Sequence, residues 1–352
     1  MELYPLLRPL IFRLDPEAAH RVTLALLRLA AGSMPGRVLV RAMFAAGQSA
    51  DPVEVFGLRF PNRLGMAAGY DKDALAWQGL ALLGFGHVEV GTVTPQPQAG
   101  NPRPRIFRLV EDRAVINRMG FPNQGAAAIA RRLAGGWRPK GAILGVNIGK
   151  NKDTPLEEAA QDYLDLLRIF APLCDYLAIN VSSPNTPGLR SLQTRQALER
   201  LLNPLAAGRA YLPRPLPLLV KLSPDLLSDE LDGALEAILS TGMDGLIASN
   251  TTLNRERLFS SRAGETGGLS GAPLKARNTC LIREISRRLG QTTRLPVVAS
   301  GGVMSVVDAR EKLDAGAVLV QLYTGLIYAG PGLVRKILSS PENRPSCMAY
   351  AI

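Results

Sequence analysis

Eight short apolar runs recur along this chain, and each of them stops at a polar or glycine-rich turn. They occupy residues 62–69, 87–91, 142–147, 176–180, 217–221, 244–249, 296–300 and 318–322. Each run is almost continuously hydrophobic, which is typical of parallel strands that are covered on both faces. Because helical patterns separate the runs, the sequence predicts an α/β fold, a (β/α)8 TIM barrel, with a doubly wound open sheet as the alternative.

Capping signals mark where two of the helices should begin. Thr154, Pro155 and Glu157 form a capping box with proline at the first helical position. Ser305 and Asp308 repeat the box before a helix that we expect to end near residue 316.

Two insertions interrupt the alternation of strands and helices. Residues 105–117 predict a hairpin that turns around Glu111 and Asp112. Residues 251–273 are rich in Gly, Ser, Thr and Arg and predict a long loop after the sixth strand. Loops of that length inside compact domains are often lids of active sites.

The first 45 residues predict a helical appendage, and residues 46–352 the barrel itself. Asp15 and Pro16 are the expected cap and first residue of a second helix. Apolar side chains repeat at helical spacing, with Arg8 and Arg13 on the other faces, at Leu3, Leu6, Leu7, Leu10, Ile11, Leu14, Ala19, Val22, Leu26 and Leu29. Such a basic amphipathic pair is typical of a membrane interface, and ordinary packing on the barrel is the alternative.

Composition excludes several classes of protein. The net charge of +11 favours acidic partners, but the arginines are scattered, without the basic runs expected of a nucleic-acid binder. Cys174, Cys280 and Cys347 lie far apart, so we expect no zinc site, other metal centre or disulfide framework. No segment has 18 uncharged apolar residues and no signal peptide is recognisable, so we expect a protein that is neither secreted nor membrane-spanning.

The polar residues gather where a barrel builds its site, at the carboxyl ends of the strands. Those ends are AAGYDKD, GTVTP, NIGKN, NVSSPNTPG, KLSPD, SNTT, SGGV and YTG. Loops after strands seven and eight commonly hold a phosphate in this fold. A phosphate-bearing cofactor is therefore expected near Gly271, Gly301, Gly302, Tyr323, Thr324 and Gly325. No GxGxxG motif or P-loop is present, which disfavours dinucleotides and nucleoside triphosphates.

Asparagines and two lysines complete the expected site. An asparagine side chain offers both a donor and an acceptor, so several together suit a planar heterocycle with alternating C=O and N–H edges. Lysine adds a positive charge for a carboxylate or for an anionic reduced flavin. The residues concerned are Asn117, Asn147, Asn180, Asn185, Asn250, Lys72 and Lys221.

Ten motifs in order along almost the whole chain resemble those of the dihydroorotate dehydrogenases. They are AAGYDKD, GTVTP, NRMGF, GVNIGKN, NVSSPNTPGLR, KLSPD, SNTTL, GGLSG, SGGV and QLYTG. The resemblance implies an FMN-bearing barrel that oxidises (S)-dihydroorotate to orotate, the fourth step of pyrimidine biosynthesis. It also implies removal of the C5 proton by a base and passage of hydride from C6 to flavin N5.

The resemblance also implies roles for individual residues. It places FMN on Ala68, Gly69, Thr92, Asn147, Asn180, Lys221, Ser249, Gly271, Gly302, Tyr323 and Thr324. It places the substrate on Lys72, Asn117, Arg118, Met119, Gly120, Phe121, Asn180, Asn185, Asn250 and Thr251. Two positions depart from the family pattern: Ser249, where relatives often have Thr, and Tyr70, where relatives commonly have Leu.

Ser183 stands at the position of the catalytic base. In this family a serine there implies the quinone-linked, membrane-associated class, whereas the soluble enzymes that reduce fumarate or NAD carry cysteine. The resemblance thus implies that the N-terminal helices touch a membrane and admit a quinone, and because no targeting segment is recognisable we expect the cytoplasmic side of an inner membrane. His20 is a candidate to bind a quinone carbonyl or is structural, and His87 is expected to be structural.

Three other functions remain open at this point. One is a soluble dihydroorotate dehydrogenase that uses fumarate or NAD. Another is a different FMN barrel oxidoreductase such as a 2-hydroxy-acid oxidase, although that chemistry relies on a histidine and neither His20 nor His87 follows a strand. The third is a membrane-bound scaffold that has lost catalysis.

Overall fold

A computed structural model describes residues 4–45, 51–290 and 295–340 of the chain. Leu3, Cys347 and the ends of the two expected domains at residues 45/46 and 352 fall wholly or partly outside this described part. The division into an appendage of residues 1–45 and a barrel of residues 46–352 therefore stays a prediction.

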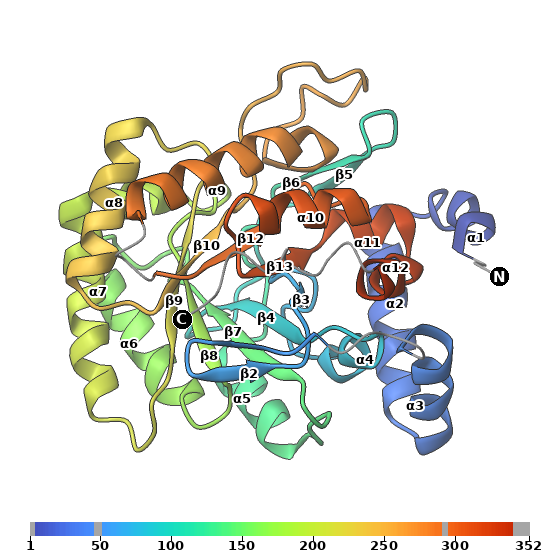
Figure 1. Cartoon of the computed structure of the whole chain (residues 1–352), viewed down its shortest axis with the longest axis horizontal. Helices are drawn as coiled ribbons and strands as arrows, with labels where there is room; N and C mark the ends of the chain where they lie inside the picture. The colour runs from blue at the N-terminus through green and yellow to red at the C-terminus, as the bar shows by residue number, and fades with distance from the viewer. Residues whose placement is uncertain (1–3, 46–50, 291–294, 341–352) are drawn as a thin grey trace.

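Eight parallel strands form a closed barrel, which confirms the predicted TIM barrel and excludes the open sheet (Figure 1). The last strand pairs with the first, Val320 opposite Leu64, and so closes the ring. Every strand lies within or overlaps one of the apolar runs: β3 (Leu64–Met66), β4 (His87–Val93), β7 (Ile143–Ile148), β8 (Tyr176–Asn180), β9 (Leu218–Leu222), β10 (Gly245–Ala248), β12 (Val297–Ser300) and β13 (Leu319–Leu322).

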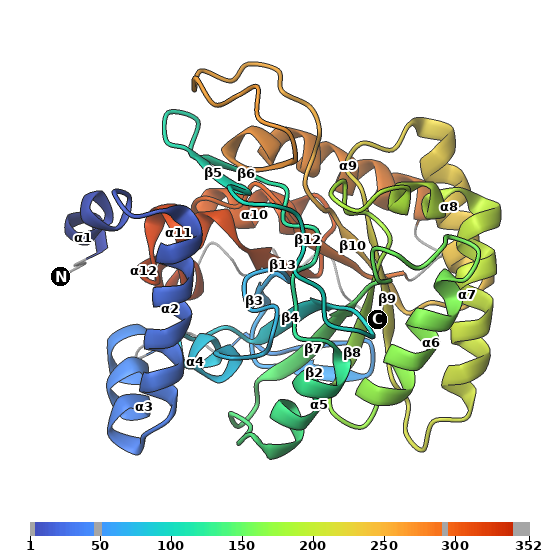
Figure 2. The same cartoon turned by 180° about the vertical axis from the view of Figure 1, so that it is seen from behind.

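Helices surround the barrel, and a short hairpin, β1 (Val53–Val55) with β2 (Leu58–Phe60), covers its amino end (Figure 2). Leucine, isoleucine and alanine side chains on the inner helix faces pack against the strands and form one large core. The helices are α4 (Trp77–Leu82), α5 (Ala126–Gly135), α6 (Ala159–Phe170), α7 (Arg195–Ala210), α8 (Ser228–Ser240), α9 (Lys275–Leu289), α10 (Val306–Asp314), α11 (Thr324–Ala329) and α12 (Gly332–Ser339), with 3-10 turns at Leu189–Gln193 and Ala272–Leu274.

One capping prediction is confirmed and the other is wrong. Ser305 caps α10, since its hydroxyl oxygen accepts a hydrogen bond from the backbone N–H of Asp308. Helix α6 begins only at Ala159, without a side-chain cap. The Thr154 hydroxyl donates instead to Asp162, and the Thr154 carbonyl accepts from the buried Lys150 ammonium, so these tertiary contacts replace the expected capping box.

A second, three-stranded sheet lies over the carboxyl end of the barrel. The predicted hairpin is confirmed as β5 (Ile106–Leu109) and β6 (Ala114–Asn117). The predicted long loop contains a third strand, β11 (Gly268–Gly271), which pairs antiparallel with β6. The prediction of a loop without strands was therefore wrong in part, because residues far apart in sequence form a small sheet that covers the site.

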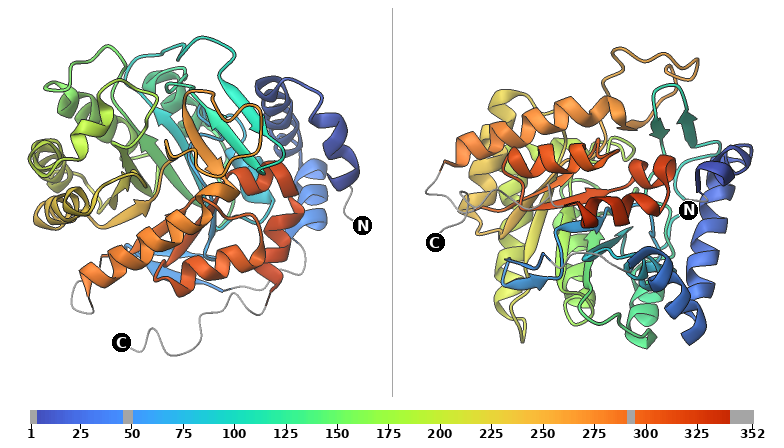
Figure 3. Two further views of the ribbon diagram at one scale, coloured as in Figure 1. Left: turned by 90° about the horizontal axis from the view of Figure 1, so that it is seen from above. Right: turned by 45° about the vertical axis from the view of Figure 1, so that its right-hand side comes forward.

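The N-terminal helices lie along one side of the barrel, beside α4 and α11 (Figure 3). Two helices were predicted, and both are present: α1 (Tyr4–Ile11) and α2 (Pro16–Ala31), the latter capped by Asp15 as expected. The structure adds α3 (Met34–Val40), which continues into a π-helical turn, Arg41–Ala45. No single helix in the described ranges is long and apolar enough to cross a membrane. Helix α2 and the segment Met34–Ala45 together have the required length and apolar composition, but the chain bends by 115° between them.

Candidate active site

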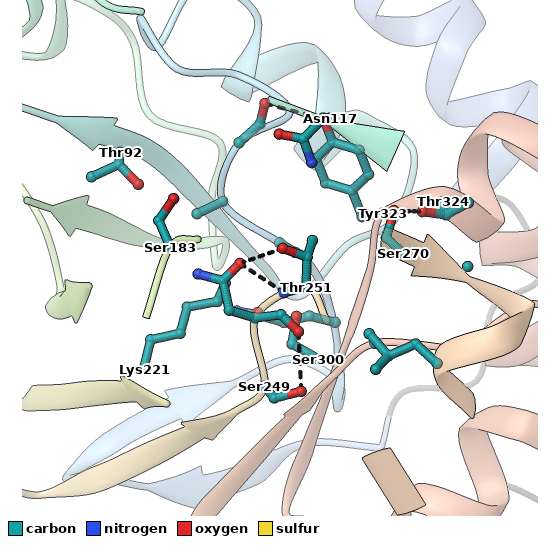
Figure 4. Close-up of a pocket in the computed structure, with 18 of the residues that line it drawn as sticks. Thr92, Asn117, Ser183, Lys221, Ser249, Thr251, Ser270, Ser300, Tyr323 and Thr324 are labelled. Atoms are coloured by element: carbon teal, nitrogen blue, oxygen red, sulfur yellow. Dashed lines mark hydrogen bonds between the residues drawn. The ribbon is translucent and has the colours of Figure 1, made fainter. Parts of the chain in front are cut away.

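A cavity opens at the carboxyl ends of the barrel strands, under the three-stranded sheet (Figure 4). It collects side chains from nearly every strand end, as the fold requires of a barrel site. The predicted residues on its wall are Ala68, Gly69, Lys72, Thr92, Asn117, Met119, Gly120, Phe121, Asn180, Ser183, Asn185, Lys221, Ser249, Asn250, Thr251, Gly271, Gly301, Gly302, Tyr323, Thr324 and Gly325.

Two predicted residues do not reach this wall. The Arg118 guanidinium turns away, pairs with Glu265 at 2.7 Å and stacks on Phe107. Asn147 is fully buried one layer beneath the cavity, where its Oδ1 accepts from the Thr92 hydroxyl at 2.6 Å.

Sequence reasoning also missed residues of the site. Ser270, Ser300 and Gln321 line the cavity, and Glu89 lies buried below it. A signal for Glu89 existed, since a carboxylate inside the apolar run HVEVG would be costly without partners.

Ser183 lies on the loop after β8 and is buried, only 5% exposed. Its Oγ accepts a hydrogen bond from the backbone N–H of Asn185 at 3.2 Å. The Asn185 amide in turn donates to Asn117 Oδ1 at 3.2 Å, across from β6. Ser183 is therefore held on the cavity wall beside two amides that were expected to bind substrate.

The two lysines of the cavity have different surroundings. Lys221 is buried, and its Nζ lies 3.8 Å from Glu89 Oε1. Burial lowers the pKa of Lys221, and the charge of Glu89 opposes that shift. Lys72 donates to the carbonyl of Gly69, and burial lowers its pKa to about 8, against the opposing charge of Asp73.

The loops after β12 and β13 make the other end of the cavity. Gly301 and Gly302 both have positive φ, and a Cβ on Gly302 would lie 2.3 Å from the Lys275 Cα, so glycine is required there. Within the described part of the chain, the N–H groups of Gly302 and Val303 have no hydrogen-bond acceptor. Such exposed N–H groups suit an anion such as a phosphate.

A second and larger cavity, about 610 Å³, lies between the N-terminal helices and the barrel. Its walls are mainly apolar side chains of α1, α2 and the turn after α3, with His20 and Arg108 among the few polar groups. Asn117 and Tyr323 line both cavities. The two chambers therefore share a wall at these two residues.

A row of aromatic rings runs along this wall. The His20 ring packs edge-to-face on Tyr70, with centroids 4.8 Å apart, and Tyr70 packs likewise on Tyr323 at 5.6 Å. Burial, and then the charge of Lys72, lowers the pKa of His20 to about 4, so its imidazole is neutral near pH 7. A neutral imidazole has a single N–H donor, for which the backbone carbonyl of Tyr70 competes with a carbonyl ligand.

Helix α2 is tied to the barrel by ion pairs. Glu17 accepts from Arg105 at 2.8 Å and from Arg103 at 2.9 Å. Burial alone would raise the pKa of Glu17, but the hydrogen bonds from the two arginines lower it to about 2.

The remaining candidates lie outside both chambers. His87 is buried at the amino end of the barrel, edge-to-face with Phe60 at 5.5 Å, where the structural interpretation placed it. Among the residues that the structure describes, no group of three or more His, Cys, Asp or Glu could hold a metal ion.

These features define a class of protein. A (β/α)8 barrel carries a site with anion-binding loops at one end and an amide-rich floor at the other, and a lipophilic chamber adjoins it. This arrangement suits a barrel enzyme with a phosphate-bearing planar cofactor and an apolar second ligand.

The chain belongs to the dihydroorotate dehydrogenase family, whose model matches residues 52–343. It is 50% identical to dihydroorotate dehydrogenase (quinone) of Roseiflexus sp. (strain RS-1), over 95% of this chain and 92% of that protein. It is 47% identical to the enzyme of the same name from Marinomonas sp. (strain MWYL1), with 97% of each chain covered.

A solved structure agrees. DHODH from Eimeria tenella, in complex with ferulenol, superposes with a TM-score of 0.81 at 37% identity, covering 92% of this chain and 89% of that one. The predicted family is confirmed, and members of this family are flavin enzymes.

Proposed function

We propose that this chain oxidises (S)-dihydroorotate to orotate on bound FMN, with Ser183 as the base, and passes the electrons to a quinone in the larger chamber. The overall reaction follows from the family: the chain is an oxidoreductase of pyrimidine biosynthesis that oxidises dihydroorotate with quinone as acceptor. The observation that carries the rest is the pair of chambers that meet at Asn117 and Tyr323.

The smaller cavity fits FMN at both ends. The N–H groups of Gly302 and Val303 and the hydroxyl of Thr324, which bonds Ser270 at 2.8 Å, suit its phosphate. Thr92, Asn180 and the other amides suit the ring. When bound, FMN supplies the acceptor for the hydride from C6 of the substrate. Lys221 places a buried cation near the edge where negative charge accumulates on reduction.

The substrate would lie against Ser183. Lys72 would hold its carboxylate, and Asn117, Asn185 and Asn250 would bond its ring amides, each of which offers a donor and an acceptor. Ser183 Oγ takes the proton from C5. A serine hydroxyl is a weak base, so its proton must leave through a hydrogen-bonded neighbour or water.

The larger chamber suits the quinone. Its apolar walls accept a lipophilic ring and tail, and His20 and Arg108 offer donors to the quinone carbonyls. The N-terminal helices expose large apolar side chains that suit the interface of a membrane, on its cytoplasmic side: Leu6, Leu7, Leu10, Leu14, Val22, Leu26, Leu29, Met34, Val38 and Leu39.

An anaerobic absorbance titration tests the proposed function. Dihydroorotate should bleach the flavin band of the purified protein, and a ubiquinone analogue should restore it. Recovery with fumarate or NAD instead would favour the soluble class. An absence of bleaching would contradict the proposal, and a colourless protein would favour the scaffold.

The pKa of Lys72 gives the reaction a pH dependence. If the ammonium binds the substrate carboxylate, binding is full below about pH 8 and weakens as the pH rises through that value. We expect KM for dihydroorotate to rise about tenfold per pH unit above the pKa of Lys72, and to become nearly independent of pH in Lys72→Met. A wild-type KM that stays flat to pH 9.5 would remove Lys72 from this role.

A further inference from the structure

A fully buried carboxylate, Glu89 on β4, lies inside the barrel beneath the smaller cavity. Donors from four other strands surround it. Asn147 Nδ2 lies 2.9 Å from Oε1, and Gln321 Nε2 and the Tyr176 hydroxyl lie 2.9 and 3.0 Å from Oε2. The Lys221 ammonium lies 3.8 Å from Oε1 and provides the positive charge.

An ionised carboxylate only accepts hydrogen bonds, so it decides which way each neighbouring amide turns. Asn147 must direct its NH2 to Glu89, and its Oδ1 then accepts from Asn180 Nδ2 at 3.1 Å. The Asn180 Oδ1 in turn accepts from Asn250 Nδ2 at 3.3 Å. Three amides thus point in one direction, from the loop after β10 to Glu89.

Gln321 is fixed by the same rule. Its NH2 is bound to Glu89, so its Oε1 is on the far side of the amide, and Gln321 lines the cavity. This Oε1 is buried and has no hydrogen-bond partner in the described part of the chain. A buried acceptor without a partner is costly, which indicates that a ligand donor satisfies it.

We propose that Glu89 is a positioning residue that sets the hydrogen-bond polarity of the cavity floor, and that Gln321 thereby presents an acceptor to a ring N–H of the bound heterocycle. The inference rests on the proposed FMN site. It adds a ligand contact, Gln321, and a carboxylate that orients both this contact and the asparagines.

The charge of Glu89 has a second effect. It lies beside Lys221, and its negative charge balances the buried ammonium. Removal of that charge leaves more net positive charge under the ring. An anionic reduced flavin is then stabilised relative to the oxidised form, so the midpoint potential should rise.

The test uses the full-length protein, released from flavin and reloaded with FMN, and compares Glu89→Gln, Gln321→Met and the exchange variant Glu89→Gln/Gln321→Glu. Glu199→Gln, in a surface ion pair with Arg195, is the matched control. The readouts are the Kd of FMN, the visible spectrum and the midpoint potential of the flavin.

Gln321→Met should weaken FMN binding about tenfold or more, because the ring N–H loses its acceptor. Glu89→Gln should weaken binding similarly, because its new NH2 meets the NH2 of either Asn147 or Gln321 and forces that amide to turn, and it should also raise the potential. In the exchange variant the carboxylate at position 321 accepts hydrogen bonds both from the amide at position 89 and from the ring N–H of the ligand. This variant should therefore recover most of the affinity for FMN.

Wild-type affinity and spectrum in Gln321→Met would overturn the contact. Loss in Glu89→Gln without recovery in the exchange variant, or without a change in potential, would reduce Glu89 to a structural role. If the wild-type chain itself binds no FMN, the proposed function fails, which is a different result from either.

Discussion

Replacement of Ser183 by alanine should slow the reduction of bound flavin by dihydroorotate by about 10²–10⁴-fold, the contribution typical of a general base. The expected loss lies in the chemical step. Among the residues that the structure describes, Ser183 Oγ makes one hydrogen bond, from the backbone N–H of Asn185, so the substitution leaves the cavity wall nearly intact. Flavin should stay bound, and reoxidation by quinone should be unchanged. Anaerobic rapid mixing measures the two half-reactions separately.

Two further variants show whether a slower flavin reduction reflects the loss of the base. Ser183→Cys places the base of the soluble class in the same wall, and should recover part of the rate with a new dependence on thiol ionisation. Ser191→Ala, an exposed serine on the following turn, is the matched control. Near-normal flavin reduction in Ser183→Ala would remove Ser183 from the base role.

Filling the larger chamber should weaken quinone binding and spare the first half-reaction. Ala19 lies on the inner side of α2 and lines this chamber. Ala19→Trp inserts an indole into the space, and overpacking of about 1–3 kcal/mol corresponds to a rise of about 5- to 150-fold in KM for quinone. Flavin reduction by dihydroorotate should remain at the wild-type rate, because Ala19 does not touch the smaller cavity.

The control is on the same helix. Ala25 is exposed and does not line the chamber, so Ala25→Trp should leave KM for quinone unchanged. Equal slowing of both half-reactions by Ala19→Trp would mean that the helix supports the barrel and that the quinone binds elsewhere.

The sequence predicted the parts of this fold that depend on local patterns. The apolar runs located all eight barrel strands, because a buried parallel strand is apolar on both faces. Asp15 and Ser305 marked helix starts, because a cap is a bond within one turn. The predicted capping box at Thr154 was wrong because the Thr154 hydroxyl donates to Asp162 and the Thr154 carbonyl accepts from Lys150. Only the folded loop creates these contacts.

Non-local pairing explains most of the remaining differences. Strand β11 was missed since Gly268–Gly271 has no strand pattern and is held by its partner β6. The motifs at the strand ends predicted much of the cavity wall. Arg118 and Asn147 were wrongly placed on this wall because they belong to the same motifs as residues that do line it. Glu89 was overlooked because its role depends on hydrogen-bond donors and a cation that lie on four other strands.

The ion pair between Glu17 and Arg105 has a consequence for truncated forms of the chain. The Arg105 guanidinium, 7% exposed, also bonds the carbonyls of Ala99 and Asn101, and the Asn101 amide bonds the carbonyl of Asn185. Helix α2, the hairpin and the loop that carries Ser183 are thus braced against each other as a single frame. Removing residues 1–45 would take away both the counter-ion of Arg105 and the helix that carries it, and would leave the frame next to the substrate loop without one of its braces. A shortened protein would therefore lose rigidity in the substrate loop as well as its quinone chamber. The kinetics of such a protein would reflect a less rigid active site and not the barrel as it is in the full-length protein.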